Sequence, residues 1–305
     1  MFHSKCLFGP APAAVAALFF VSTALADSIP VVNSGSLVAH FRVSNGTVAR
    51  DGSGNVTSWT ADNNPSLVLN SVGVNPSNIK YSSTGMNGAP VIVSSDPVAT
   101  QNQVLVGAIP GSHSATTVFW LGYYNPTHTS FGNYVYSYGA DGADGSQFDH
   151  QIDNTTFQLY GGAGTQSGAN ISGLNSTYTV WRTEYGLGTG NGHAAFAGNT
   201  NLNVTSPNGG NYNVSGNLML FGYQNGSGVS GGFNFTGNFA ELIIYDGILS
   251  APDVAAVQSY LVGRAAGDLG EPNSSAVPEP SAWALMVGCG LLIAARRKSR
   301  LPVRL

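Results

Sequence analysis

Short apolar runs between clusters of glycine, asparagine and serine constrain the fold of this chain more than any other feature. Between residues 29 and 238, runs rich in Val, Phe, Tyr and Thr recur, and no segment shows convincing helical periodicity. Glycine is abundant between the runs and tolerates the positive φ that tight hairpins demand. Such runs between turn residues are typical of an antiparallel sandwich or barrel. The pattern therefore predicts an all-β domain.

The expected strands can be placed from the apolar runs themselves. Each run carries the β-branched or aromatic side chains that fit a pleated, half-buried surface. The predicted strands are Leu37–Val43, Val91–Ser94, Thr116–Tyr124, Asn133–Tyr138, Phe148–Ile152, Thr156–Tyr160, Tyr178–Tyr185, His193–Phe196, Asn201–Val204, Leu218–Phe221 and Asn238–Tyr245.

One short helix is predicted at the C-terminal end of this region. Ser250 can cap it, Pro252 falls in the first turn where a missing amide costs little, and Asp253 occupies the capping-box position. Apolar residues then recur at helical spacing, which predicts a stripe that packs onto the sheets. The stripe and the glycines that bracket its end are Val254, Val257, Leu261, Gly263 and Gly267. Residues 269–276 read as a linker.

The N-terminus has the composition of a secretory signal peptide. Lys5 supplies a positive charge, residues 11–25 are mostly small and apolar, and a small-x-small pattern precedes Asp27. We expect residues 1–26 to be removed by cleavage before Asp27. An uncleaved membrane anchor is the alternative, but the core is short and Pro10 and Pro12 interrupt its start.

The C-terminal end combines three elements of different chemistry. They are the extended motif Val277, Pro278, Glu279 and Pro280, the apolar segment 281–295, and the basic cluster Arg296, Arg297 and Lys298. Proline lacks an amide donor and favours an extended backbone, so the motif stays accessible to another protein. The basic cluster resists translocation and stays cytoplasmic.

This order of motif, short span and basic tail resembles the PEP-CTERM sorting signal. The resemblance implies processing by an exosortase-type enzyme and covers about a tenth of the chain. The apolar segment 281–295 falls short of the roughly 20 residues that cross a bilayer core. We therefore expect a transmembrane segment that anchors the chain in the inner membrane only transiently. A buried core helix is the alternative, which the abrupt basic ending disfavours.

Setting both signals aside changes the composition of the exported part, residues 27–276. Cys6 and Cys289 both lie in the signals, so this part has no cysteine for a disulfide, a thiolate metal site or a nucleophile. It keeps five basic and fourteen acidic residues, a net charge of −9. Nucleic acid and anionic lipid are poor partners for that charge, whereas neutral glycans, cations and surface proteins remain candidates.

Segments near both ends of the exported part resemble a laminin-G-like, concanavalin A-like domain. Residues 235–250, followed by 257–261, are similar to the closing strand and helix of that family. Residues 51–62 resemble its opening segment, and residues 117–119 the start of a core strand. The resemblance implies an antiparallel jelly-roll β-sandwich with one short C-terminal helix over residues 27–268. Residues 123–145 depart from the family pattern, so a binding site could lie there.

No catalytic motif is evident. Glu241 is the tempting acid, but in an alternating apolar strand a structural carboxylate that pairs with an arginine or turn amides is the favoured interpretation. Jelly-roll glycoside hydrolases need paired carboxylates about 5–5.5 Å apart, and their Glu-x-Asp-x-Glu spacing is absent. No Gly-x-Ser-x-Gly elbow occurs in a strand-to-helix setting, and His40 is interpreted as a hydrogen-bonded structural residue.

Two groups of residues are candidate binding sites. Asp141, Asp144 and Asp149 form the densest acidic cluster, which could supply oxygen ligands to calcium or could be a solvated turn. Tyr134, Tyr136 and Tyr138 alternate along one strand, so their rings face the same way and could stack on sugar rings or fill the core. Trp120 and Trp181 are predicted to be core residues.

These patterns predict an exported, non-enzymatic protein of a Gram-negative bacterium. We expect it to pass through an inner-membrane intermediate and reach the cell surface or extracellular matrix. There, a lectin-like sandwich would bind an exopolysaccharide or other glycan, or another matrix component. No cofactor is required, and calcium is the candidate ion. The alternatives are a structural matrix protein without a defined ligand and a divergent glycoside hydrolase.

Overall fold

A computed structural model describes residues 29–267, except 45, 74–77, 96–102, 126–132, 140–146, 154–155, 162–163, 172–173, 175–176, 188–191, 205–213, 226–227 and 231–234. These residues belong to one compact unit, Ser28–Leu269. The predicted signal peptide and sorting signal lie outside the described residues. Within the described part, no helix has the length and apolar character that a bilayer crossing requires.

An antiparallel sheet of eight strands forms one layer of the described unit. Its central strand is β19 (Gly237–Asp246), which pairs with β8 on one side and with both β6 and β1 on the other. The strand order is β15 (Thr200–Asn201), β14 (Gly192–Ala197), β13 (Thr179–Leu187), β8 (Thr116–Tyr124), β19, β6 (Ala89–Ser94) and β5 (Ile79–Met86), with β1 (Ser36–Arg42) off this path.

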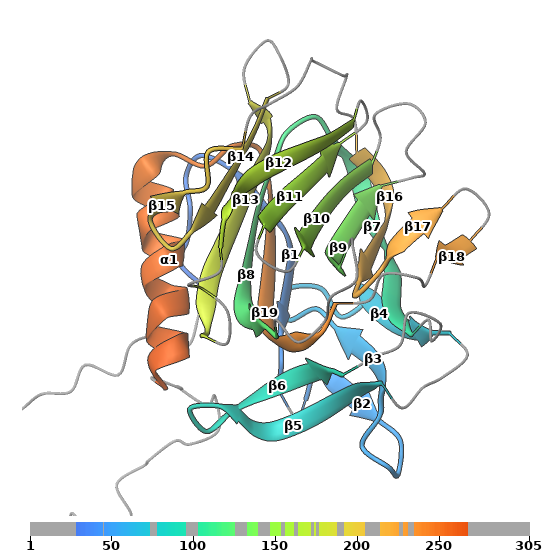
Figure 1. The fold of residues 1–305 in the computed structure, drawn as a ribbon. Coiled ribbons are helices and arrows are strands. Elements are labelled where there is room, and N and C mark those ends of the chain that lie inside the picture. The colour runs from blue at the N-terminus through green and yellow to red at the C-terminus, as the bar shows by residue number, and fades with distance from the viewer. Residues whose placement is uncertain are drawn as a thin grey trace, which may run out of the picture. The chain divides into compact units, whose positions relative to one another are not determined.

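A second antiparallel sheet of nine strands packs against the first. Its order is β12 (Gly164–Asn170), β11 (Thr156–Gly161), β10 (Gln147–Asp153), β9 (Asn133–Gly139), β16 (Val214–Leu220), β7 (Val104–His113), β4 (Val68–Val72), β3 (Val56–Thr60) and β2 (Val48–Arg50). A small hairpin of β17 (Tyr223–Asn225) and β18 (Gly228–Ser230) lies beside it (Figure 1). The described domain is thus a β-sandwich, as the sequence predicts.

The central strands of the eight-stranded sheet are buried on both faces. In β8, Val118 and Trp120 belong to the core between the sheets, whereas Phe119 and Leu121 belong to a second cluster beneath the helix. Successive side chains of a strand point to opposite faces, so a strand covered on both sides must be apolar throughout. This accounts for the continuous apolar runs of β8 and β19.

Helix α1 (Ala251–Ala266) forms a third layer and lies beside β13 (Figure 1). Ser250 caps it, with the Ser250 hydroxyl accepting from the Asp253 amide, and Gly267 ends it in the left-handed conformation at φ 91°. Val254, Val257 and Leu261 pack onto the outer face of the eight-stranded sheet. The predicted cap, apolar stripe and C-terminal glycine are confirmed.

The strand predictions fail in two ways: one predicted strand is too long, and strands β2, β3, β4, β5, β7, β12, β17 and β18 were not predicted. The predicted strand Asn201–Val204 is wrong beyond its first residue, because Asn203 adopts a positive φ of 49° and β15 ends at Asn201. Strand β7 was not predicted, because Gly107, Pro110 and Gly111 resemble turn residues. A Cβ at Gly107 would lie 2.2 Å from the Val68 carbonyl oxygen, so the close approach of β4 requires this glycine inside a strand.

Candidate functional site

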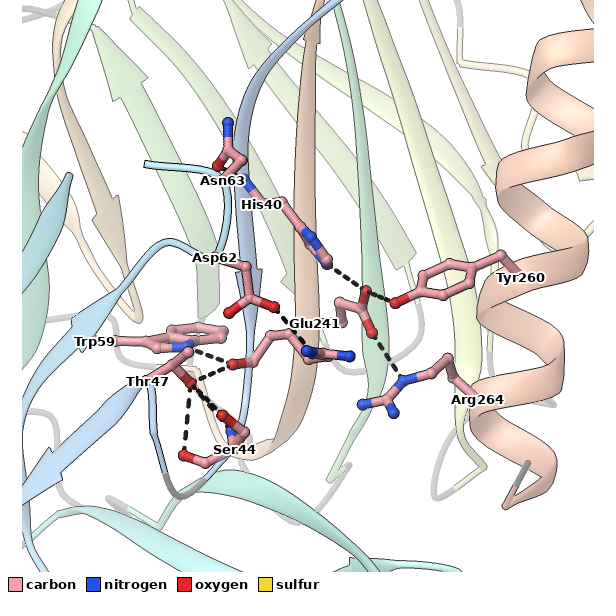
Figure 2. A network of polar contacts seen from close by, with 10 residues as sticks. His40, Ser44, Thr47, Trp59, Asp62, Asn63, Glu241, Tyr260 and Arg264 are labelled. Carbon is pink, nitrogen blue, oxygen red and sulfur yellow. Dashed lines mark hydrogen bonds and ion pairs between the residues drawn. The ribbon is translucent and has the colours of Figure 1, made fainter. Parts of the chain in front are cut away.

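A polar cluster surrounds Glu241, which is fully buried between the eight-stranded sheet and α1 (Figure 2). His40 Nε2 lies 2.6 Å from Glu241 Oε1, and the Tyr260 hydroxyl donates to the same oxygen at 2.8 Å. Arg264 Nε donates to Oε2 at 3.2 Å. Both carboxylate oxygens are therefore occupied by protein donors.

Strand register and helix periodicity bring these donors together. His40 and Arg42 are two residues apart in β1 and share one face, and β1 places Arg42 opposite Glu241. Tyr260 and Arg264 are four residues apart in α1 and so share one side of the helix. Glu241 thereby joins the first strand, the last strand and the helix.

The partners of Glu241 determine its charge. Burial alone would raise the pKa of the Glu241 carboxyl, but the hydrogen bond and charge of His40, together with Arg264 and Tyr260, outweigh it and hold the pKa below its ordinary value. Burial and the Glu241 charge raise the pKa of the Tyr260 hydroxyl, so Tyr260 stays a neutral donor. The structure thus bears out the structural interpretation of Glu241.

A neighbouring ion pair extends this cluster toward the loop after β3. Arg42 Nε lies 2.9 Å from Asp62 Oδ2, and the Arg42 carbonyl accepts hydrogen bonds from Trp59 Nε1 and the Thr47 hydroxyl (Figure 2). Burial raises the pKa of Asp62, partly offset by the charges of Arg42 and His40. These contacts hold the loop after β3 against β1.

The described residues do not assemble a nucleophilic triad around His40. The His40 ring is hydrogen-bonded to Glu241, and no serine or threonine hydroxyl in the described part of the chain hydrogen-bonds to it. His40 is thus a hydrogen-bonded structural residue, as predicted. The cluster lacks both the nucleophile and the access that acyl transfer needs.

The sequence left two roles open for the tyrosine row, sugar stacking and core filling, and the row lies mainly in the core. Tyr136 and Tyr138 are fully buried between the sheets, and Tyr134 is half-buried. The Tyr136 hydroxyl hydrogen-bonds to Thr183 and, at 3.3 Å, to the Tyr185 hydroxyl on the opposite sheet. A ring without exposed surface cannot stack on a sugar, so the core-filling alternative holds for Tyr136 and Tyr138.

The remaining predicted site residues lie outside the described residues. This applies to Asp141 and Asp144, to the side chain of Asp149 in β10, to the sorting motif 277–280 and to the basic cluster 296–298. Within the described part, no group of three or more His, Cys, Asp or Glu side chains could hold a metal ion. The calcium prediction is therefore untested.

A pocket of about 270 Å³ opens between the outer face of β13 and α1. Arg182 and Glu184 line it from β13, Asn199 from the turn after β14, and Gln258 from α1. The rest of the lining is apolar: Leu249, Ala251, Val254 and Ala255.

An ion pair forms the polar side of this pocket. Arg182 Nε lies 3.0 Å from Glu184 Oε1, with the two side chains 12% and 10% exposed. Burial raises the pKa of Glu184 and lowers that of Arg182, and in each case the charge of the other residue opposes the shift. The pocket therefore presents a fixed donor beside a fixed acceptor with no net charge.

This pocket was not predicted from the sequence, although the pairing of Arg182 with Glu184 could have been inferred from it. Arg182 and Glu184 are two residues apart in a predicted strand, so they had to share a face. A charged pair on one strand is conspicuous because residues 27–276 contain only five basic residues. The contribution of Gln258 depends on how α1 packs, which no local pattern encodes.

Comparison with known proteins identifies no family. No protein-family model matches the sequence, and no curated protein matches it. Among solved structures, the chain is similar to domain 4 of AbnA, a GH43 extracellular arabinanase from Geobacillus stearothermophilus in complex with arabinotriose. The identity is 14%, covering 74% of this chain and 100% of that chain, with a TM-score of 0.48.

Two further solved structures show similar levels of likeness. One is an arabinofuranosidase complexed with arabinofuranosyl-alpha-1,2-xylobiose, at 13% identity, 76% and 59% coverage of this and that chain, and a TM-score of 0.48. The other is the CBM40 of the Ruminococcus gnavus IT-sialidase bound to alpha2,3 sialyllactose, at 14% identity, 48% and 83% coverage, and a TM-score of 0.38. At TM-scores below 0.5, none of these carries an argument about the function of this chain.

Proposed function

We propose that this protein is an exported β-sandwich that binds a glycan or another surface component without chemically altering it. One observation carries the choice of binding over hydrolysis: every acidic side chain that the structure describes is engaged in a structural contact. These contacts are Asp51 with Ser53 and Asn55, Asp62 with Arg42, Glu184 with Arg182, Glu241 with its three donors, Asp246 with His113, and Asp253 with Asn33, Ser34 and Ser250.

Glycoside hydrolysis requires two carboxyl groups on opposite sides of the bond that breaks. Glu241 is inaccessible, and Glu184 is the one carboxylate of its pocket. The exported part has a net charge of −9, which favours a neutral glycan over nucleic acid or anionic lipid. These observations support binding to a neutral glycan.

The test is retention of the full chain, purified in mild detergent, on a panel of immobilised exopolysaccharides and β-glucans. We expect retention on at least one polysaccharide and no release of reducing ends from any of them. Folded protein that is retained by none would favour a structural matrix protein. Hydrolysis of a β-glucan that one carboxylate substitution abolishes would establish a glycoside hydrolase and overturn the proposal.

The route of export forms part of the same proposal. The order of motif 277–280, apolar segment 281–295 and basic cluster 296–298 supports sorting by an exosortase-type enzyme through a transient inner-membrane intermediate. We also propose that the sandwich is a jelly roll of the laminin-G-like, concanavalin A-like type, on the resemblance of residues 51–62, 117–119, 235–250 and 257–261.

Mass spectrometry of the protein recovered from its natural host checks the processing. We expect a mature chain that begins at Asp27 and ends near Pro278, Glu279 and Pro280, because a span of 15 residues is marginal as a permanent anchor. A mature chain that still ends at Leu305 would contradict exosortase processing. A chain that retains Met1 would contradict the signal peptide.

A further inference from the structure

We propose that the pocket between β13 and α1 binds a neutral saccharide through two adjacent hydroxyl groups, with Arg182 donating to one and Glu184 accepting from the other. This inference rests on the proposed function and gives it a place and a ligand chemistry. A hydroxyl group both donates and accepts, an arginine only donates, and an ionised glutamate only accepts. A donor beside an acceptor therefore matches a pair of neighbouring sugar hydroxyls.

The pair is held in position before any ligand arrives. Arg182 lies opposite Phe196 in the register of β13 and β14, and its guanidinium carbon lies 3.7 Å from the centre of the Phe196 ring. The Glu184 carboxylate then fixes the guanidinium from the neighbouring position of the same face, with Nε and Oε1 3.0 Å apart. Groups that are immobilised in advance lose little side-chain entropy on binding.

Two amide residues add polar groups to the lining of the pocket. Gln258 is 9% exposed and lines the pocket from α1. Asn199 lines the pocket with a second amide. These amides can both donate to and accept from further hydroxyl groups of a sugar.

Size and charge define the class of ligand. A volume of about 270 Å³ is near the lower end of small-molecule sites, roughly 300 Å³, and suits one sugar ring rather than a longer oligosaccharide. The charge of Arg182 is already balanced by Glu184, so a carboxylate on the ligand would meet no free cation within the pocket. We therefore expect a neutral sugar to bind better than a uronic acid.

Titration of the full chain with methyl glycosides of D-mannose, D-glucose and D-galactose, and with D-glucuronate, tests the inference. Affinities come from calorimetry, and the side-chain amide signals of Asn199 and Gln258 are followed by NMR. We expect at least one neutral glycoside to bind and to shift both amide signals. Its deoxy analogue, which lacks one of the adjacent hydroxyls, is expected to bind at least tenfold more weakly.

Two variants probe the pocket, and a third serves as the matched control. Glu184→Gln removes the acceptor charge at constant shape, and Ala255→Leu fills the pocket from an exposed helix position. Both are expected to weaken binding at least tenfold at unchanged far-UV circular dichroism. Val262→Leu, which enlarges a side chain at a helix position that is 54% exposed and outside the pocket, should change the affinity less than twofold.

The outcomes separate this inference from the proposed function. Wild-type affinity in both folded pocket variants would overturn the pocket and leave glycan binding at another site. Tighter binding of glucuronate than of every neutral glycoside would overturn the ligand class. If neither the glycosides nor the immobilised polysaccharides bind to folded protein, both the inference and the proposed function fail.

Discussion

Replacing Glu241 with glutamine is expected to lower the free energy of unfolding by about 3–5 kcal/mol, because it leaves Arg264 as a buried cation without a counter-charge. The Arg264 side chain is 7% exposed, so water cannot replace the lost carboxylate. Denaturation of the full chain in guanidinium chloride, followed by tryptophan fluorescence, measures the loss. A Glu241→Gln variant as stable as the wild type would contradict the role that we assign to this network.

The double variant Glu241→Gln with Arg264→Met provides the internal control. It removes the unpaired cation while the glutamine oxygen can still accept from His40 and Tyr260. We therefore expect the double variant to be more stable than Glu241→Gln alone, since residues in one network do not act additively. Equal or lower stability would show that the ion pair is not the source of the effect.

The lowered pKa of Glu241 also predicts that its contribution to the free energy of unfolding is lost in acid. The pKa of Glu241 lies below its ordinary value of 4.5, so the folded state binds fewer protons than the unfolded state at this group. Its stabilising contribution is present above pH 4.5 and is lost as the pH falls through the lower folded-state value. The unfolding free energy of Glu241→Gln should therefore decline less steeply on acidification below pH 4.5 than that of the wild type.

Substituting Trp120 with alanine should cost about 3–5 kcal/mol of unfolding free energy. The ring of Trp120 is fully buried and lies between Trp181 and Phe239, with centroid distances of 5.4 and 5.1 Å and interplanar angles of 6° and 5°. Phe235 contacts it edge-on at 5.9 Å. Removal would leave a cavity at the centre of the core between the sheets.

Chemical denaturation of Trp120→Ala and Trp120→Phe tests this prediction. Phenylalanine keeps an aromatic ring in the stack, so Trp120→Phe should lose clearly less unfolding free energy than Trp120→Ala. The near-UV circular dichroism of the alanine variant should also weaken, because one of the two stacked indoles is removed. Equal losses for the two variants would contradict the stabilising role that we assign to an aromatic ring at this position.

Local sequence patterns were sufficient to predict an element wherever the residues that set its bounds lie within or beside that element. Strand β8 has the predicted bounds, because its sequence is a continuous run rich in β-branched and aromatic residues with turn-forming residue types on both sides. Helix α1 carries its start and stop residues within its own sequence. Strand β7 was missed because Gly107 serves a close contact with β4, and that neighbour lies far away in the sequence.

The candidate sites were harder to predict because their parts come from distant segments. The carboxylate of Glu241 meets His40, 201 residues away, and Arg264, 23 residues away. The pocket joins β13 to α1, where Arg182 and Gln258 belong to different elements. A sequence pattern shows that Arg182 and Glu184 share a face, but not what covers that face.

By itself, the sequence determined that residues 27–276 form an acidic, cysteine-free β domain with one capped helix. It did so because strand alternation, turn residues and helix caps act over a few residues. Only the tertiary structure decided that Tyr136 and Tyr138 point into the core and that both carboxylate oxygens of Glu241 are hydrogen-bonded. It also decided that Arg182 and Glu184 border a pocket. The physical reason is that periodicity determines which side chains share a face, whereas burial depends on which distant element packs against that face.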